Sequence, residues 1–515
     1  MELTPRTRMV LAFLVGVWSL AAQFIFNRII FFYIANSEYV AASIISIHLA
    51  GFWLGTLVAR RVRLDILWLI GFTILATLAA NIIVWRIGAA VIGLPLTVIS
   101  AVVCGLILAA LSGALVVRLM GDSTEDGRGV VIADSAGSVL GAVLGGFILI
   151  PQLGLSIAFA SVLALQSLVM VGMLMVLRPG LRSAAALSVP VIAALLVTLQ
   201  APRQSGTEML VVDGLPIERT FAQSQTRVLY SDNSPYGLVS VLQDAEGAKK
   251  LLIDNRPLCG TVKGDALKTL SEWVVGDTPM EMMKFNPRPD WRTANVGLGC
   301  GVTVAAMLGK LPPSGRLDIV EINPDMPAAQ KNFWPDLAHT PEDARASIHI
   351  EDGFRFFAER KDQDLYDVVV IDVAWMQNMN ATHLFSKEMY EHIARQLHDD
   401  GVLAVWSEEG NPFSAVSLIM YRTLREVFPH VVIDTTSGVA LFYASKTRGD
   451  LVNFLKPEAM QANGWISEIG MQAPVNRLDN LVMNRHKFTV FGDSTWDRLF
   501  DKYAFSDRAT SSDGN

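Results

Sequence analysis

Long apolar runs recur through the first 200 residues of this chain and then stop. Most of them supply the roughly 20 residues that a helix needs to cross the hydrocarbon core of a bilayer. No small-residue cleavage site follows the first run, which indicates a retained span rather than a signal peptide. The last run is short and contains Pro190, so we expect six or seven spans in a transmembrane helical bundle over 1–200. The runs lie at 9–33, 39–59, 66–85, 90–117, 130–150, 155–177 and 184–200.

The arginines between these runs predict how the bundle is oriented. All but one of those in the connections fall on one side, and Arg86 alone falls on the other, so the positive-inside rule places the N-terminus in the cytoplasm. If 184–200 crosses the membrane, the rest of the chain lies outside the cell; if it lies at the interface, the rest stays in the cytoplasm. The arginines of the cytoplasmic side are Arg6, Arg8, Arg60, Arg61, Arg63, Arg118, Arg128, Arg178 and Arg182.

Three glycines in the fifth run, Gly137, Gly141 and Gly145, share one helix face at four-residue spacing. Such a face lets another helix backbone approach closely, either in a dimer or inside one bundle. Polar residues such as His48 and Asp134 fall in or near the spans, but they form no repeated ladder of charges. We therefore expect a structural anchor rather than a transporter, and a homodimer.

After residue 200 the chain becomes polar and its pattern changes twice. Over 201–290 a linker leads to short alternating segments separated by turn residues, which predict a small antiparallel β unit and then a helix near 264–275. The three strands of that unit are expected at 226–231, 237–243 and 249–254.

Over 291–447 strands alternate strictly with helices, which predicts a parallel sheet covered on both faces. The last two strands are joined by only a few residues around Gly438, a link that permits a hairpin but no parallel crossover. The fold class is therefore a transmembrane bundle followed by a Rossmann-like α/β domain of the class I methyltransferase type, with 448–515 as a C-terminal tail. The strands are expected at 293–298, 316–322, 347–351, 366–373, 401–407, 430–435 and 439–444.

Composition supports this division and excludes several classes of protein. Of 515 residues 51% are hydrophobic, and the first 200 carry eleven Arg, no Lys and seven acids, a net charge of +4. The remainder carries a net charge of −11, which argues against nucleic acid as a partner. Three cysteines, Cys104, Cys259 and Cys300, predict neither a disulfide framework nor a metal site.

Ligand-compatible residues stand at the ends of four successive strands, where sheets of this kind bind their ligands. Glu321 ends the second strand, Asp352 and Gly353 end the third, and Asp372 ends the fourth. The alternative is that Glu321 and Asp352 cap helices. The first strand ends in a glycine loop that contains Gly297, Gly299, Cys300 and Gly301.

The stretch from VGLGCG through DIVEINPD, EDGFRFF, YDVVVID and LFSKEMY resembles the spermidine synthase family of polyamine aminopropyltransferases, as does SPYGLVSV with LLIDNRPLCG before it. The resemblance covers about 225–445. It implies that Glu321 holds a ribose, Asp352 an adenine and Asp372 the reacting centre of a sulfonium nucleoside. That substrate would be S-adenosylmethionine or its decarboxylated form, methylthioadenosine would be the product, and no other cofactor or metal is implied.

The departures from the family concern the groups that hold amines. Where the family's glycine loop ends in Asp, this chain has Cys300; where its fourth strand has a second Asp, this chain has Trp375. The family's Tyr-His-Glu has no counterpart near 267–269. Because a buried diamine needs paired carboxylates, we expect ordinary spermidine synthesis to be lost.

An S-adenosylmethionine lyase, in which the substrate's own carboxylate displaces methylthioadenosine, needs no amine. Trp375 then faces the sulfonium by cation–π attraction, or it fills the empty diamine pocket. Cys300 is either a nucleophile or, since no His is near in sequence, a packing group against the nucleoside. The alternatives are aminopropyl transfer to an unusual acceptor, methyl transfer to a membrane substrate, and a nucleoside-binding sensor or transporter. Since sulfonium nucleosides are made in the cytoplasm, we expect a multi-pass inner-membrane protein with a cytoplasmic catalytic domain.

Overall fold

The computed structural model divides the chain into two compact units. One contains Met1–Gln225 and Ser231–Leu238, and the other contains Thr226–Tyr230 and Val239–Asn515. The structure describes residues 3–33, 38–62, 64–86, 94–120, 124–199, 211–212, 215–216, 227–234, 236–253, 256–261, 264–284, 288–360, 365–374 and 381–485.

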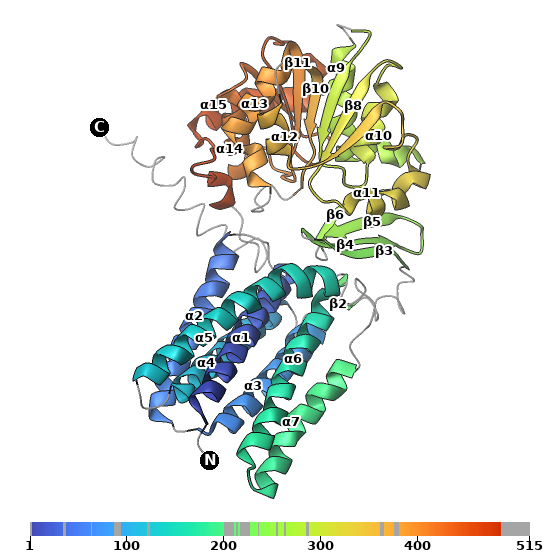
Figure 1. Ribbon diagram of the computed structural model, residues 1–515. Helices are drawn as coiled ribbons and strands as arrows, with labels where there is room; N and C mark the ends of the chain where they lie inside the picture. Colours follow the sequence, from blue (N-terminus) through green and yellow to red (C-terminus); the bar gives the residue numbers. More distant parts are fainter. Residues whose placement is uncertain are drawn as a thin grey trace, which may run out of the picture. The chain divides into compact units, whose positions relative to one another are not determined.

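The first unit is a bundle of long helices that follow the predicted apolar runs (Figure 1). Two of them, α3 and α5, continue into a π-helical turn, and α6 bends at Gly154, whose φ of 79° suits glycine. The helices are α1 (Pro5–Tyr33), α2 (Glu38–Arg61), α3 (Ile66–Ala80) with η1 (Asn81–Arg86), α4 (Leu94–Leu119), α5 (Thr124–Val143) with η3 (Leu144–Leu149), α6 (Ile150–Leu177) and α7 (Leu181–Leu199).

Six of these helices are long and apolar enough to cross a membrane. The seventh apolar stretch, Leu181–Val197, is shorter. The predicted runs are thus confirmed as helices, while their crossing of a bilayer stays a prediction. The six stretches are Pro5–Ile30, Ala41–Arg61, Ile66–Val84, Ile99–Leu119, Glu125–Leu149 and Leu153–Leu177.

The glycine face of α5 packs against α1 of the same chain. A Cβ added to Gly137 would lie 1.9 Å from the carbonyl oxygen of Phe13, and one added to Gly141 would lie 2.2 Å from that of Val17. Only glycine permits so close an approach of two backbones. The face is therefore used inside the bundle, and the expected homodimer loses this support.

The small β unit has four strands in the order β3-β4-β5-β6, of which the sequence predicted three. The fourth, β6, pairs antiparallel with β5. It contains Pro257 and Gly260, two residue types that are uncommon inside strands, so the sequence pattern did not predict it. The strands are β3 (Arg227–Ser234), β4 (Gly237–Gln243), β5 (Lys249–Ile253) and β6 (Arg256–Thr261), and a two-stranded ladder, β1 (Val211–Val212) with β2 (Leu215–Pro216), precedes them.

The large sheet has seven strands in the order β12-β13-β11-β10-β7-β8-β9. The first five in sequence pair in parallel, and β13 pairs antiparallel with both β11 and β12, which confirms the terminal hairpin. Every predicted strand is present. They are β7 (Arg292–Val296), β8 (Arg316–Glu321), β9 (Ala346–Ile350), β10 (Tyr366–Ile371), β11 (Leu397–Trp406), β12 (His430–Asp434) and β13 (Leu441–Ser445).

Helices cover both faces of this sheet, because alternate residues of a strand point to opposite sides. Val368 and Val370 of β10 pack in the core that includes α9 and α10. Val369 and Ile371 pack in the core of α12, α13 and α14. The helices are η4 (Gly264–Thr269), α9 (Ser271–Met283), α10 (Val302–Lys310), α11 (Met326–Gln330), η5 (Lys331–Asp336), α12 (Gly353–Glu359), η6 (Thr382–Phe385), α13 (Lys387–Gln396), α14 (Ala415–Arg425), η7 (Leu451–Phe454), α15 (Pro457–Ile469), η8 (Gly470–Gln472) and η9 (Val482–Arg485).

Candidate functional site

The glycine loop connects β7 to α10 at the carboxyl edge of the sheet. Gly297, Gly299 and Gly301 all have positive φ, of 99°, 46° and 80°, which disfavours any residue with a side chain. A Cβ on Gly297 would lie 2.2 Å from the carbonyl oxygen of Asp372. The loop therefore lies directly against the end of β10, where the sequence predicts the reacting centre.

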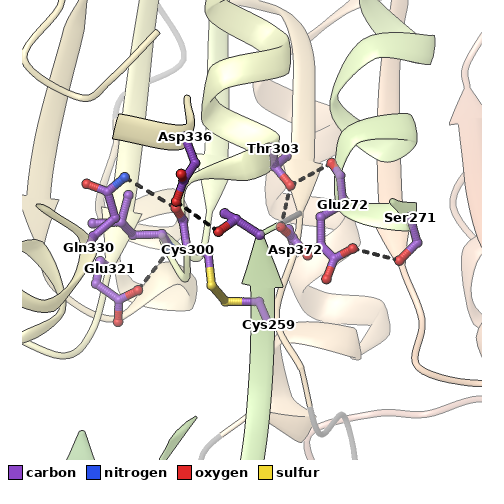
Figure 2. Close-up of a disulfide and its surroundings, with 11 residues drawn as sticks. Cys259, Ser271, Glu272, Cys300, Thr303, Glu321, Gln330, Asp336 and Asp372 are labelled. Atoms are coloured by element: carbon purple, nitrogen blue, oxygen red, sulfur yellow. Dashed lines mark hydrogen bonds between the residues drawn. A yellow bond between two sulfur atoms is a disulfide. The ribbon is translucent and has the colours of Figure 1, made fainter. Parts of the chain in front are cut away.

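A disulfide joins Cys300 of this loop to Cys259 of β6, with their Cα atoms 6.0 Å apart (Figure 2). The expectations that the cysteines form no disulfide and that Cys300 is a nucleophile or a packing thiol are therefore wrong. The two residues are 41 positions apart, and only the packing of the β unit against the loop brings them together.

An ion pair holds the small four-stranded sheet, which contains Cys259, against the Rossmann-like domain. Lys249 Nζ lies 2.8 Å from the carboxylate of Asp336, and both side chains are almost buried. Thr261, at the end of β6, donates a hydrogen bond to the same carboxylate at 3.2 Å. These two contacts with Asp336 hold the small β sheet, and with it Cys259, against the Rossmann-like domain.

Glu321, at the end of β8, is buried and holds two backbone segments in place. One carboxylate oxygen accepts a hydrogen bond from the amide of Leu298 at 2.9 Å, and the other accepts one from Asn323 at 2.8 Å. Burial raises the pKa of this carboxyl against the opposing effect of the backbone hydrogen bonds. Glu321 thus tethers the glycine loop to the end of β8.

Asp352 precedes α12 and takes one of the two roles considered from sequence, that of a helix cap. Its carboxylate accepts a hydrogen bond from the amide of Arg355, which makes it the N-cap, and it lies 2.8 Å from His383 Nε2. Gly353 follows it as the first residue of α12. His383 was missed from sequence because it follows β10 in a separate short helix.

Asp372 follows β10 and does not stand alone. Thr303 Oγ1 is hydrogen-bonded to its carboxylate and, at 2.8 Å, to the backbone carbonyl of Glu272 (Figure 2). Burial first, and then the negative charge of Glu272, raise the pKa of Asp372 to about 7. The hydroxyl has a single proton to share between these two acceptors, and its donation to the carboxylate opposes the rise in the pKa of Asp372.

Glu272 is a second residue of the candidate site that sequence reasoning missed. It lies at the start of α9, just after the segment 267–269 that was compared with the family's Tyr-His-Glu. Its carboxylate accepts a hydrogen bond from Ser271 at 2.9 Å, and Ser271 accepts one from Trp406 Nε1 at 3.0 Å. A second carboxylate therefore acts on Asp372, while the expected loss of the family's amine-holding acids stays a prediction.

Trp375, the other residue predicted to act in catalysis, lies outside the described residues. Among the residues that the structure does describe, no group of three His, Cys, Asp or Glu side chains is placed to hold a metal ion. The described site is therefore built from a glycine loop, a disulfide and acids at the ends of strands.

Known proteins match this domain. The spermine/spermidine synthase domain matches residues 295–449. The polyamine aminopropyltransferase of Moorella thermoacetica is 29% identical over 203 residues, which cover 39% of this chain and 68% of that protein. The polyamine aminopropyltransferase of Agathobacter rectalis is 30% identical over 206 residues, 39% of this chain and 67% of that protein.

Among solved structures, spermidine synthase from Thermotoga maritima is similar with 20% identity and a TM-score of 0.36, over 50% of this chain and 84% of that one. The residues matched by the spermine/spermidine synthase domain lie in the second unit. By the extent of these sequence matches, this chain belongs to the spermidine synthase-like family of polyamine aminopropyltransferases.

Proposed function

We propose that this chain is an S-adenosylmethionine lyase that releases methylthioadenosine and homoserine lactone. The observation that carries the proposal is the disulfide on the glycine loop, at the position where the resemblance implies an aspartate for the amine of decarboxylated substrate. Beside it lie two carboxylates, that of Asp372 after β10 and that of Glu272 in the first turn of α9.

The charge at the loop decides which sulfonium nucleoside fits. Two like charges 4 Å apart repel by about 4 kcal/mol at an effective dielectric constant of 20. An aspartate at this position would therefore repel the carboxylate of S-adenosylmethionine, whereas the buried, uncharged Cys300 does not. The substitution favours the substrate that still carries its carboxylate.

The carboxylates of Asp372 and Glu272 can bind the other charged group of the methionine tail, its α-ammonium. An ammonium group between two acids is stabilised when it leaves water, and the α-ammonium of S-adenosylmethionine is such a group. Held from that side, the methionine tail can fold so that its own carboxylate approaches the γ-carbon.

The reaction then balances without an external acid or base. A carboxylate oxygen forms a bond to the γ-carbon while the carbon–sulfur bond breaks, and its electron pair goes to sulfur. The products are neutral methylthioadenosine and a five-membered lactone that keeps the ammonium. Because nucleophile and electrophile belong to one molecule, orientation supplies most of the acceleration.

Aminopropyl transfer from decarboxylated S-adenosylmethionine to an amine is the second candidate. It is favoured by Asp372, whose pKa of about 7 suits a base that removes a proton from an attacking amine at neutral pH. The named relatives are aminopropyltransferases as well. In this reaction the acceptor nitrogen takes the place of the substrate's carboxylate.

The test uses the full chain, purified in detergent and incubated with S-adenosylmethionine alone or with decarboxylated S-adenosylmethionine plus diamines. Mass spectrometry should find methylthioadenosine and homoserine lactone from the first mixture. Methylthioadenosine formed only when an amine is supplied would establish the second candidate instead. S-adenosylhomocysteine, or no turnover at all, would contradict both.

A pair of double variants tests the charge argument directly. Cys259→Ser with Cys300→Asp restores the acid, and Cys259→Ser with Cys300→Ser removes the disulfide without adding charge. We expect the first to bind S-adenosylmethionine at least about 100-fold more weakly than the second, as the repulsion above implies. Equal affinities would remove the basis for preferring the lyase.

A further inference from the structure

The disulfide and the seventh helix lead to a conclusion about the compartment in which the second unit works. Disulfides persist in oxidising compartments and are rare in the cytoplasm, where thiols are kept reduced. Cys300 is buried and Cys259 is partly buried, so this bond belongs to the packed interior of the unit. We infer that the second unit lies on the non-cytoplasmic side of the membrane.

Helix α7 determines the number of crossings on which this inference depends. Leu187, Val191 and Ala194 form one buried stripe, spaced four and three residues apart. Leu187 packs over Gly71 of α3, where an added Cβ would lie 3.2 Å from its Cδ2. α7 is thus an integral helix of the bundle.

The opposite face of α7 is apolar and exposed. It presents Val189, Ile192, Leu195 and Leu196, the last of them 55% exposed. Such a face is costly in water and ordinary against lipid chains. With 19 residues α7 is about 28 Å long, close to the roughly 30 Å hydrocarbon thickness. These features assign α7 as a seventh span, although it is shorter than the other six.

Seven crossings place the two ends of the bundle on opposite sides. The arginine asymmetry puts the N-terminus in the cytoplasm, so the chain leaves α7 at Leu199 on the side that carries Arg86 alone. No apolar run over 200–226 is long enough to return. Charge distribution, helix packing and the disulfide therefore agree, against the expectation of a cytoplasmic domain.

The inference also fixes a step that must precede the reaction, if the proposed function holds. A sulfonium nucleoside carries permanent charge and does not cross the hydrocarbon core unaided. The nucleoside must then reach this domain in one of two ways: a carrier transports it out of the cytoplasm, or it comes from the surroundings of the cell.

A cysteine introduced at one of two positions, expected on opposite sides of the membrane, tests the sidedness with the full chain, which keeps Cys259 and Cys300. Ser467→Cys lies on the exposed surface of α15, and Gly180→Cys lies between α6 and α7, where an added side chain meets no neighbour. Both are made with Cys104→Ser and treated in intact cells, after permeabilisation of any outer membrane, with a membrane-impermeant maleimide. We expect labelling at 467 in intact cells and labelling at 180 only after lysis.

The opposite pattern would overturn the inference. A second readout traps thiols with an alkylating agent before lysis and then looks for the linked Cys259–Cys300 peptides. Both cysteines recovered alkylated from untreated cells would also contradict it. Neither measurement depends on turnover, so a failure of the proposed reaction leaves this test intact.

Discussion

His383 Nε2 lies 2.8 Å from one carboxylate oxygen of Asp352, while the other oxygen accepts a hydrogen bond from the Arg355 amide. Burial alone would raise the pKa of Asp352, yet these hydrogen bonds outweigh burial and lower it. Asp352 therefore stays ionised at neutral pH and is held in one orientation. Capping a helix and binding a nucleoside are compatible roles here, since the carboxylate keeps further lone pairs free.

Asp352→Ala should affect stability and ligand binding together. Loss of the N-cap lowers the free energy of unfolding by about 1 kcal/mol. Loss of a charged acceptor weakens methylthioadenosine binding by roughly 10- to 100-fold. Asp352→Asn keeps the cap, and Glu359→Ala at the other end of α12 should leave binding unchanged. Calorimetry and thermal denaturation measure both effects, and wild-type affinity in Asp352→Ala would contradict the role in binding.

The activity on S-adenosylmethionine should rise as the pH passes through about 7. Asp372 must be ionised to hold the ammonium, and its pKa is raised to about 7. Glu272→Gln removes a neighbouring negative charge, so the midpoint of kcat/KM against pH should move to lower pH. Asp277→Asn, on the same helix, is the control and should leave the midpoint where it is. An unmoved midpoint in Glu272→Gln would show that the two carboxylates do not interact.

Breaking the pair of Lys249 and Asp336 should be costly. Their side chains are 8% and 11% exposed, so removal of one partner leaves an uncompensated charge and lowers stability by about 3–5 kcal/mol. Replacing both, as Lys249→Met with Asp336→Leu, should cost less than either single change. Lys284→Ala, which breaks an exposed pair with Glu281, is the control. Additive losses in thermal denaturation would contradict a direct pairing.

Loss of the disulfide should loosen the second unit. Cys259→Ser opens a crosslink between residues 41 apart and should lower the free energy of unfolding by roughly 2–4 kcal/mol. Cys104→Ser, which removes the free cysteine, should have no such effect. Thermal denaturation of the full chain, followed with and without reductant, separates the two. Equal sensitivity of wild type and Cys259→Ser to reductant would contradict the bond.

The glycines of α5 should tolerate no side chain. Gly141→Ala places a methyl group 2.2 Å from the carbonyl oxygen of Val17 and must push α1 and α5 apart. We expect a clear loss of thermal stability in detergent. Gly172→Ala in α6 meets no atom within 4 Å and should be neutral or slightly stabilising. If both variants melt like wild type, the close packing of α1 and α5 is not required.

The sequence by itself determined the helices of the bundle, all seven strands of the large sheet and the order of the acids along it. These features are local: apolar runs, alternation of strands and helices, and polar residues that directly follow strands. The ends of parallel strands meet at one edge, so Glu321, Asp352 and Asp372 could be placed at the site without coordinates.

Only the tertiary structure decided which residues meet across long separations. Cys259 and Cys300, Lys249 and Asp336, His383 and Asp352, and Glu272 and Asp372 come from different elements, and no spacing rule relates them. The glycine face of α5 shows the same limit, because its spacing permits a partner helix from either the same chain or another. In the structure the partner is α1 of the same chain, because packing the two helices together buries the apolar faces of both within one bundle.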